Sequence, residues 1–160
     1  SEHDCDEFNS GADELDDWLK ERALNSTMSG NANTYVATTG GQRVVAYYAL
    51  AAAGVANDSG AVPGAVRRQA PNEIPCLILA RLAVDQRFQG KRLGKRLFQD
   101  ALWRSARVAK DIGFRALLVH ARDEEAVAFY KALTPSFRPS PSDGLHLYLP
   151  VRALLEIQGS

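Results

Sequence analysis

The sequence lacks an apolar stretch long enough to cross a bilayer, which takes about 20 residues in a helix. Its longest apolar runs, such as Val44–Val55 with its many small residues, fall short of that length. The N-terminus is acidic, whereas a secretory signal peptide begins with a basic segment. We therefore expect a cytoplasmic protein that makes no contact with a membrane.

Cysteine is also scarce, with Cys5 and Cys76 as the two instances in 160 residues. Two cysteines so far apart in a cytosolic chain predict free thiols rather than a disulfide. Cys76 lies in the apolar run Ile74–Ala80, which favours burial of its side chain. The spacing carries no metal-ligand signature, so we predict no metal site. The sequence has no internal repeat and no low-complexity tract.

The length and composition are those of a globular protein, with 46% hydrophobic and 24% charged residues. A chain of 160 residues can bury a core, and we predict a single domain over residues 1–160. The formal net charge is zero, but residues 1–20 contain eight acids and one lysine. Residues 91–110 contain seven bases and one aspartate. This segregation indicates an anionic partner on one face, although a solvated helix face gives the same pattern.

Hydrophobic periodicity predicts the order of the elements. We predict helices over 12–24, Gly94–Ile112 and Glu124–Leu133, and strands over Thr34–Thr39, Arg43–Ala53, Pro75–Val84, Phe114–His120 and Leu145–Leu149. We expect Asn9 or Ser10 to cap the first helix and the Gly40-Gly41 pair to form a hairpin turn. Loops are expected over Asn25–Asn33 and Gly54–Asn72, the second with a short helix, and the tail from Pro150 has helical character. This order predicts an α/β (α+β) protein with a mixed sheet and helices on its faces.

A strand, a glycine-containing turn and a helix follow one another between Leu79 and Ile112. The first N–H groups of a helix lack partners within it and lie at the positive end of its dipole. Glycine lets such a turn approach an anion closely, and Lys91, Lys95 and the arginines beside them add positive charge. The pattern indicates a phosphate-binding turn. The glycine positions alone are equally consistent with a turn that needs glycine only for its geometry.

The same segment resembles the acetyl-CoA motif of the GNAT acetyltransferases, written Gln/Arg-x-x-Gly-x-Gly/Ala. Gln89 stands at its first position and Gly94 at its last, while Arg92 replaces the middle glycine. A second stretch, Asp123–Tyr130, is similar to the Asn-x-x-Ala-x-x-Phe-Tyr stretch of these enzymes, with Asp123 in place of asparagine. The resemblance implies the GNAT fold, a central mixed sheet flanked by helices, and acetyl-CoA as the co-substrate.

The resemblance also implies roles for particular residues. Tyr130 is expected to be the catalytic general acid, which protonates the CoA sulfur. The strand end is expected to pair with the pantetheine arm, and the amides of the turn to bind the pyrophosphate. The residues expected to bind acetyl-CoA are Leu82, Ala83, Val84, Gln89, Gly90, Lys91, Arg92, Leu93, Gly94, Lys95, Asp123 and Phe129.

A third resemblance, to the GNAT toxins of toxin–antitoxin pairs, extends over nearly the whole chain. The segments that carry it include Phe8–Gly11, Leu15–Lys20, Arg67-Arg68 and Val119-His120-Ala121. It implies a toxin that acetylates the α-amino group of aminoacyl-tRNA and so inhibits translation. It also implies a homodimer bound by a ribbon-helix-helix antitoxin. The residues expected to contact tRNA phosphates are Arg67, Arg68, Arg92, Lys95, Arg96 and Arg104.

The chemistry of this acceptor agrees with the lack of an evident catalytic base. An α-amino group titrates near about 7.7–8.0, against about 10.4 for lysine, so part of it is already neutral at pH 7. His120 and Glu73 are candidates for a base acting through water, although a structural or solvated role suits each better. Two alternatives remain open. One is a GNAT acetyltransferase acting on a small-molecule or protein amine, and the other is a GNAT-fold interaction partner that binds CoA poorly because of Arg92.

Overall fold

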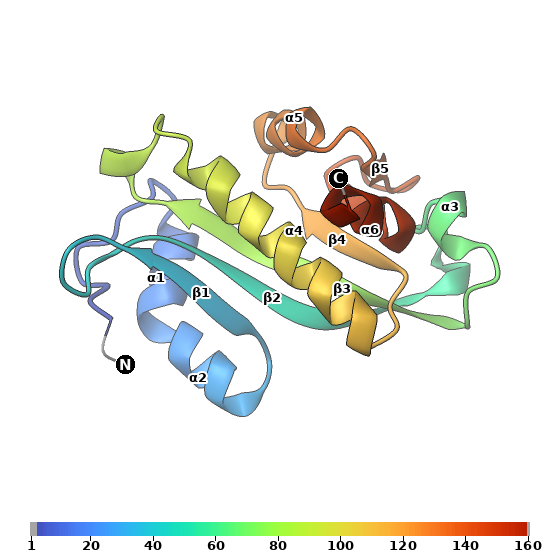
Figure 1. The fold of residues 1–160 in the computed structure, drawn as a ribbon, viewed down its shortest axis with the longest axis horizontal. Coiled ribbons are helices and arrows are strands. Elements are labelled where there is room, and N and C mark those ends of the chain that lie inside the picture. The colour runs from blue at the N-terminus through green and yellow to red at the C-terminus, as the bar shows by residue number, and fades with distance from the viewer. Residues whose placement is uncertain (1–2, 160) are drawn as a thin grey trace. The chain divides into compact units, whose positions relative to one another are not determined.

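The structure, a computed structural model, describes residues 3–159 of the chain (Figure 1). Its helices are α1 (Asp13–Glu21), α2 (Ala23–Ser29), α3 (Gly64–Arg67), α4 (Leu93–Asp111), α5 (Glu124–Leu133) and α6 (Val151–Gly159), with short 3-10 turns η1 (Asn57–Ser59) and η2 (Gln86–Phe88). Its strands are β1 (Asn33–Thr38), β2 (Val44–Ala56), β3 (Glu73–Val84), β4 (Ala116–His120), β5 (Arg138–Pro139) and β6 (His146–Pro150). The strands form one six-stranded sheet in the order β1-β2-β3-β4-β6-β5.

The sheet is mixed, because β3 and β4 run parallel whereas β1 and β2, β4 and β6, and β5 and β6 run antiparallel. This confirms the predicted α/β fold with a mixed sheet. The chain divides into two compact units, here called the first unit (Ser1–Ala51 with Ala80–Ala101) and the second unit (Ala52–Leu79 with Leu102–Ser160). The elements β2, β3 and α4 contribute residues to both units. The single domain over residues 1–160 stays a prediction.

The first unit packs α1 and α2 against the hairpin of β1 and β2. The two strands pair from Asn33↔Leu50 to Thr38↔Val44, and the turn residue Gly41 has a φ of +84°, which confirms the predicted hairpin. Trp18 stacks on Tyr47 at 5.8 Å between ring centroids, and the Arg81 guanidinium lies 4.4 Å from the Trp18 ring. The buried side chains of this core are Phe8, Trp18, Leu19, Ala23, Val44, Tyr47, Ala49 and Ala83.

Two predictions for the N-terminal region are wrong. The N-cap residue of α1 is Ala12, because Ser10 instead donates its amide (2.9 Å) and its hydroxyl (2.6 Å) to the carboxylate of Asp16. The predicted loop after the first helix contains most of α2, which begins at Ala23 and which Gly30 ends with a φ of +80°. The polar sequence of α2 buries little besides Ala23, so it carries no apolar stripe from which a helix is predicted.

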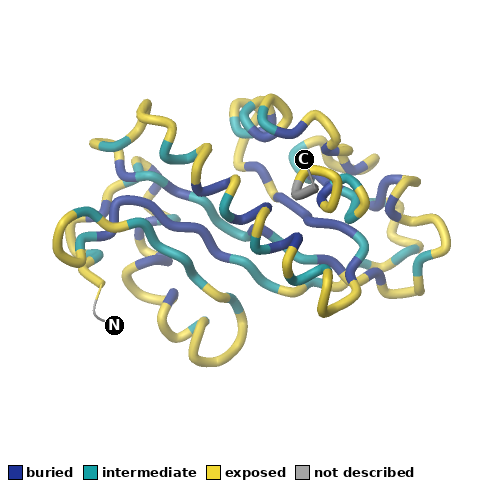
Figure 2. Tube along the Cα trace, in the orientation of Figure 1, coloured by how far each residue is buried: buried dark blue, intermediate teal, exposed yellow. Residues whose placement is uncertain are grey.

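The second unit is built around β4. This strand pairs with β3 from Cys76↔Ala116 to Leu79↔Val119 and with β6 from Ala116↔Pro150 to His120↔His146. Figure 2 shows how far each residue along these strands is buried. The buried side chains of one core cluster in this unit are Val62, Val66, Ile74, Cys76, Ala116, Leu118 and Tyr148.

The predicted elements of the second unit are largely confirmed. Helix α5 has the predicted bounds, and the short helix expected in the loop after β2 is α3. Strand β2 continues to Ala56, so that loop begins later than predicted. The two-residue strand β5 has no counterpart among the predicted elements, because two residues show no periodicity.

Both cysteines are free thiols, and Cys76 is buried, as predicted, while Cys5 is partly exposed. Among residues 3–159, the helices are all too short or too polar to span a membrane. In the same part of the chain, no group of three or more histidine, cysteine, aspartate or glutamate side chains could hold a metal ion.

Candidate functional site

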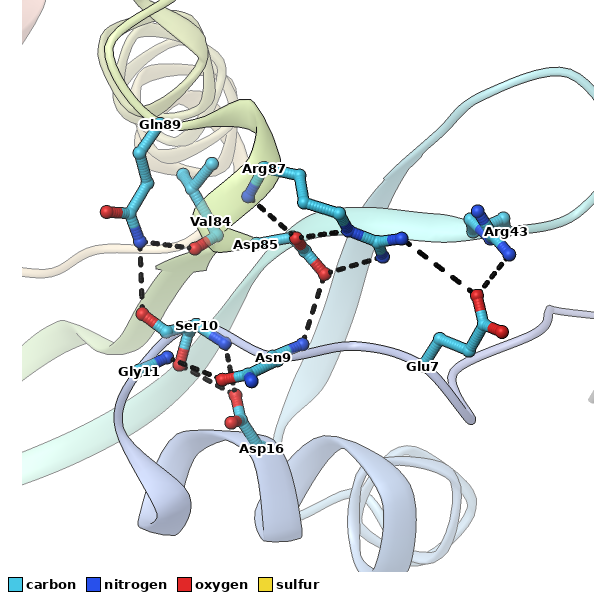
Figure 3. A network of polar contacts seen from close by, with 10 residues as sticks. All are labelled: Glu7, Asn9, Ser10, Gly11, Asp16, Arg43, Val84, Asp85, Arg87 and Gln89. Carbon is cyan, nitrogen blue, oxygen red and sulfur yellow. Dashed lines mark hydrogen bonds and ion pairs between the residues drawn. The ribbon is translucent and has the colours of Figure 1, made fainter.

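The turn that follows β3 is anchored by Asp85, whose side chain is 1% exposed. Its carboxylate accepts hydrogen bonds from the amides of Arg87 (2.9 Å) and Asn9 (3.1 Å) and from two nitrogens of the Arg87 guanidinium (3.0 and 3.1 Å; Figure 3). The Arg87 side chain is the largest influence on this carboxyl and lowers its pKa to about 2. The Asp85 amide in turn donates to the carbonyl of Val45 at 2.8 Å. At neutral pH the turn is therefore held by a buried, ionised carboxylate.

Gln89, the first residue of the motif, uses its side chain to hold the backbone. Its Nε2 donates to the carbonyls of Ser10 (3.0 Å) and Val84 (2.9 Å), and the amide of Gln86 donates to the carbonyl of Asn9 (2.8 Å). These bonds join the N-terminal segment to the end of β3 and to η2 within the first unit. The Gln89 side chain is thus committed to positioning the turn.

The backbone at Gly11 accounts for the glycine in the sequence Asn9-Ser10-Gly11. Its φ of +91° lies in the left-handed region, and a Cβ at this position would lie 2.5 Å from Nε2 of Gln86. Glu7, which precedes Gly11 in the same segment, forms an ion pair with Arg43 and lies 4.0 Å from Arg87. The side chains of Glu7, Arg43 and Arg87 are 42–60% exposed, so their ion pairs add little stability.

Helix α4 begins with amides that have no partner inside the helix. The Arg96 amide donates to the Arg92 carbonyl at 3.1 Å, so the amides of Leu93, Gly94 and Lys95 precede this bond. The chain enters the helix through two residues in the left-handed region, Gly90 with a φ of +79° and Arg92 with a φ of +63°. Arg92 therefore takes the backbone conformation for which glycine is the usual residue, although it replaces the motif's glycine.

The remaining acetyl-CoA candidates of the first unit surround this entry. Leu82, Ala83 and Val84 end β3, with Ala83 buried and the other two partly buried. Lys91 is exposed, and its ammonium lies 5.5 Å from the ring centroid of Phe88. The first unit thus brings a strand end, a rigid turn and a helix N-terminus together with nearby bases, an arrangement that can bind a phosphate.

Helix α5, in the second unit, carries the other motif. Asp123 is its N-cap, with a carboxylate that accepts from the Ala126 amide at 2.8 Å. Tyr130 is 8% exposed, and its ring centroid lies 5.2 Å from that of Phe129 and 6.3 Å from that of Phe137. Burial raises the pKa of Tyr130 to about 12. The phenol is therefore protonated at neutral pH, as a proton donor must be.

His120, one of the two base candidates, is stacked on His146 across the β4–β6 ladder with ring centroids 3.9 Å apart. Burial, followed by the nearby His146, lowers the pKa of His120 below its usual value. Nε2 of His146 lies 3.5 Å from the Asp143 carboxylate. Glu73, the other candidate, is exposed and packs over Gly54. No pattern in the sequence indicates that His146 or Asp143 lies near His120. The pairing of β4 with β6 places His146 beside His120, and Asp143 lies next to His146.

The predicted tRNA contacts divide between the two units. Arg92, Lys95 and Arg96 belong to the first unit and are exposed. Arg67 and Arg68, at the end of α3, belong to the second unit and are also exposed. The sixth candidate, Arg104, lies on the part of α4 in the second unit and is partly buried.

Comparison with known proteins identifies relatives of this chain. Residues 30–133 match the family model described as an acetyltransferase (GNAT) domain. The sequence is 45% identical over 146 residues to the tRNA-acetylating toxin of Mycobacterium tuberculosis (strain ATCC 25618 / H37Rv). The aligned residues make up 91% of this chain and 85% of that protein.

Solved structures share the fold. AtaT complexed with acetyl-methionyl-tRNAfMet has a TM-score of 0.85 and 24% sequence identity, over 99% of this chain and 94% of that one. A mutant AtaT toxin bound to the C-terminus of the antitoxin AtaR and acetyl-CoA has a TM-score of 0.81 and 23% identity, over 100% of this chain and 93% of that one.

Proposed function

Because this chain belongs to the GNAT acetyltransferase family, we propose that it acetylates the α-amino group of aminoacyl-tRNA with acetyl-CoA and so inhibits translation. The observation that carries the proposal is the 45% identity, over 91% of the chain, to a tRNA-acetylating toxin. The neighbour AtaT, complexed in separate structures with acetyl-methionyl-tRNAfMet and with acetyl-CoA, supports both the acceptor and the donor.

We assign acetyl-CoA binding in the first unit to the end of β3 and the turn after it. The amides of Leu93, Gly94 and Lys95 would donate to the pyrophosphate, and the backbone of Leu82–Val84 would pair with the pantetheine arm. The anchoring of this turn by Asp85 supports the assignment, because amides bind an anion best when their directions are fixed beforehand.

Tyr130 is the general acid of the proposed reaction. The neutral α-amine attacks the thioester carbonyl carbon, the carbon–sulfur bond breaks, and the departing sulfur takes the proton of Tyr130. The attacking nitrogen loses one proton as it becomes the amide, and that proton returns to the tyrosine through solvent. The products are N-acetyl-aminoacyl-tRNA and CoA. The role is consistent with the state of the side chain, since a tyrosine phenol is protonated at neutral pH and can donate to the sulfur.

The partners follow from the same assignment. We propose a ribbon-helix-helix antitoxin as the cognate inhibitor, since the neighbour AtaT is bound to the C-terminus of an antitoxin. We further propose that the toxin is a homodimer and that it acts in the cytoplasm, where charged tRNA is found. The six basic residues named above would contact tRNA phosphates.

The test is acetyl transfer from radiolabelled acetyl-CoA to total charged tRNA, with uncharged tRNA as control. We expect label on charged tRNA only, and its loss after hydrolysis of the aminoacyl ester. Growth arrest on expression that disappears with Tyr130→Phe is the matching result in cells.

A protein that binds acetyl-CoA but leaves charged tRNA unlabelled would overturn the proposed acceptor. Label on a small-molecule or protein amine would then identify the alternative acetyltransferase. A protein that binds no acetyl-CoA would favour the interaction partner instead.

A further inference from the structure

We propose that Arg115 is a positioning residue for tRNA binding. It fixes the backbone of Arg68 so that the Arg68 side chain can contact a phosphate. This inference rests on the proposed function, because it concerns how the charged tRNA is held. All residues involved belong to the second unit.

The segment between β2 and β3 carries Arg67 and Arg68. Its regular structure is the 3-10 turn η1 and the single-turn helix α3. A helix of four residues has too few internal bonds to be stable alone, so contacts from elsewhere must fix the segment.

Arg115 supplies the main contact. Its Nη2 donates to the carbonyl of Arg68 at 2.7 Å and to that of Val66 at 3.2 Å, and its Nε donates to Val66 at 3.3 Å. The guanidinium thus satisfies carbonyls at the end of α3 and places positive charge at the negative end of the helix.

Arg115 is itself held firmly. Its amide donates to the Pro75 carbonyl at 2.8 Å, and its carbonyl accepts from the Val151 amide at 2.9 Å. The backbone of Arg115 is therefore bonded to β3 on one side and to the start of α6 on the other. A guanidinium mounted on this base fixes the segment to the sheet of its own unit.

Asn57 closes the segment at its other end. Its amide group donates to the carbonyls of Ala70 and Pro71, both at 3.2 Å, and its backbone N–H donates to Asn72 at 2.8 Å. Gln69 lies between the two anchors with a φ of +58°, a backbone conformation that residues other than glycine rarely adopt. The anchors therefore impose the course of the backbone immediately after Arg68.

The two arginines of the segment differ in what their side chains do. Nε of Arg67 donates to Oδ1 of Asn57 at 3.1 Å, so its guanidinium is part of the internal bonding. Arg68 is exposed, and within residues 3–157 its guanidinium makes no hydrogen bond or ion pair. The bond from Arg115 goes to the backbone of Arg68 and leaves this guanidinium available. Arg68 is thus a charged group on a fixed backbone, which lowers the entropy lost when a phosphate binds.

The experiment compares Arg68→Ala, Arg115→Ala and the double variant in acetylation of charged tRNA at several salt concentrations. We expect Arg68→Ala to raise KM for charged tRNA about tenfold and to reduce the salt dependence by about one phosphate contact. Arg115→Ala should raise the same KM about fivefold, and the double variant should equal Arg68→Ala alone. KM for acetyl-CoA should stay unchanged in all three.

Arg152→Ala is the matched control, because Arg152 is an exposed arginine of the same unit outside this segment. It should leave the salt dependence almost unchanged. Arg115→Lys should restore part of the affinity, since an ammonium can still donate to the carbonyls, and it carries the test should Arg115→Ala fail to fold.

Additive effects of the two substitutions would overturn the role of Arg115, and so would equal increases of KM for tRNA and acetyl-CoA. Failure of the parent protein to acetylate charged tRNA is a separate result. It would remove the proposed function before the variants were compared.

Discussion

The turn after β3 and the helix α5 both match GNAT motifs, but the protein holds them in different ways. The turn is held by polar side chains that bond to backbone groups, chiefly Asp85 and Gln89. Helix α5 has one polar cap at Asp123, and Tyr130 is packed among the rings of Phe129 and Phe137. Each arrangement suits a different task. A turn that binds an anion through amides needs a fixed backbone, whereas a phenol that donates a proton needs a fixed position, which packing between the two rings provides.

The largest expected effect tests the chemical half of this comparison. Tyr130→Phe keeps the ring contacts but removes the acidic proton, so kcat should fall by about 10²–10⁴-fold while acetyl-CoA affinity stays the same. Single-turnover acetyl transfer measures the rate, and calorimetry measures the affinity. Tyr148→Phe is the control, because Tyr148 is also buried in the second unit but carries no proposed chemistry. A kcat within about threefold of the parent would remove Tyr130 from the mechanism.

The next effect tests the polar half. Asp85→Asn removes the charge that pairs with Arg87 and should lower the free energy of unfolding by about 2–3 kcal/mol at pH 7. It should also weaken acetyl-CoA binding, because the turn loses its anchor. Urea denaturation and calorimetry measure the two effects. Asp58→Asn, at an exposed aspartate outside this turn, should change neither.

The pH dependence gives Asp85→Asn a second measurement. The folded pKa of Asp85 is lowered from 3.8 to about 2, so its contribution is present above about pH 4 and is lost as the pH falls through 2. The difference in unfolding free energy between parent and variant should therefore shrink as the pH falls from 4 toward 2. A difference that stays constant over that range would show that the carboxylate charge is not what holds the turn.

The sequence predicts those parts of the fold that local patterns specify. The β1–β2 hairpin follows from Gly40-Gly41 between two alternating runs, and α5 follows from its helical spacing. Helix α2 is missed because its polar residues have no stripe, although the tertiary structure holds it. Local pattern is thus sufficient where the signal lies within a few neighbouring residues.

The site follows the same rule. The motif identifies Gln89 and Gly94, but the bond from Asn9 to Asp85 joins residues 76 apart, and the bond from Arg115 to Val66 joins residues 49 apart. Such partners have no common periodicity, so they emerge only from the fold. The same limit explains why the resemblance identifies Tyr130 and Gln89, while the bonds from Asn9 and Arg87 to Asp85 emerge only from the structure.

A smaller effect is expected at the cap of α5. Asp123→Ala should lower the free energy of unfolding by about 1 kcal/mol, because the Ala126 amide loses its acceptor, and Tm should fall by about 2–4 °C. Asp123→Asn should cost almost nothing, since asparagine caps equally well. Thermal denaturation of the two variants measures the cap. Equal losses in both would show that the negative charge at the helix N-terminus, not the hydrogen bond, is what matters.

The smallest effect concerns Arg92, where the structure keeps a glycine-like backbone without glycine. Arg92→Gly removes the strain of a φ of +63° but adds flexibility to the unfolded chain, so stability should rise by no more than about 0.5–1 kcal/mol. KM for acetyl-CoA should change less than about threefold, because the amides of Leu93–Lys95 keep their directions. Arg92→Ala removes the same charge but keeps the strain, and it separates the two causes. A large rise of KM for acetyl-CoA in both variants would mean that the Arg92 guanidinium itself binds the phosphates. The turn would then act through a side chain as well as through its amides, as α5 acts through the side chain of Tyr130.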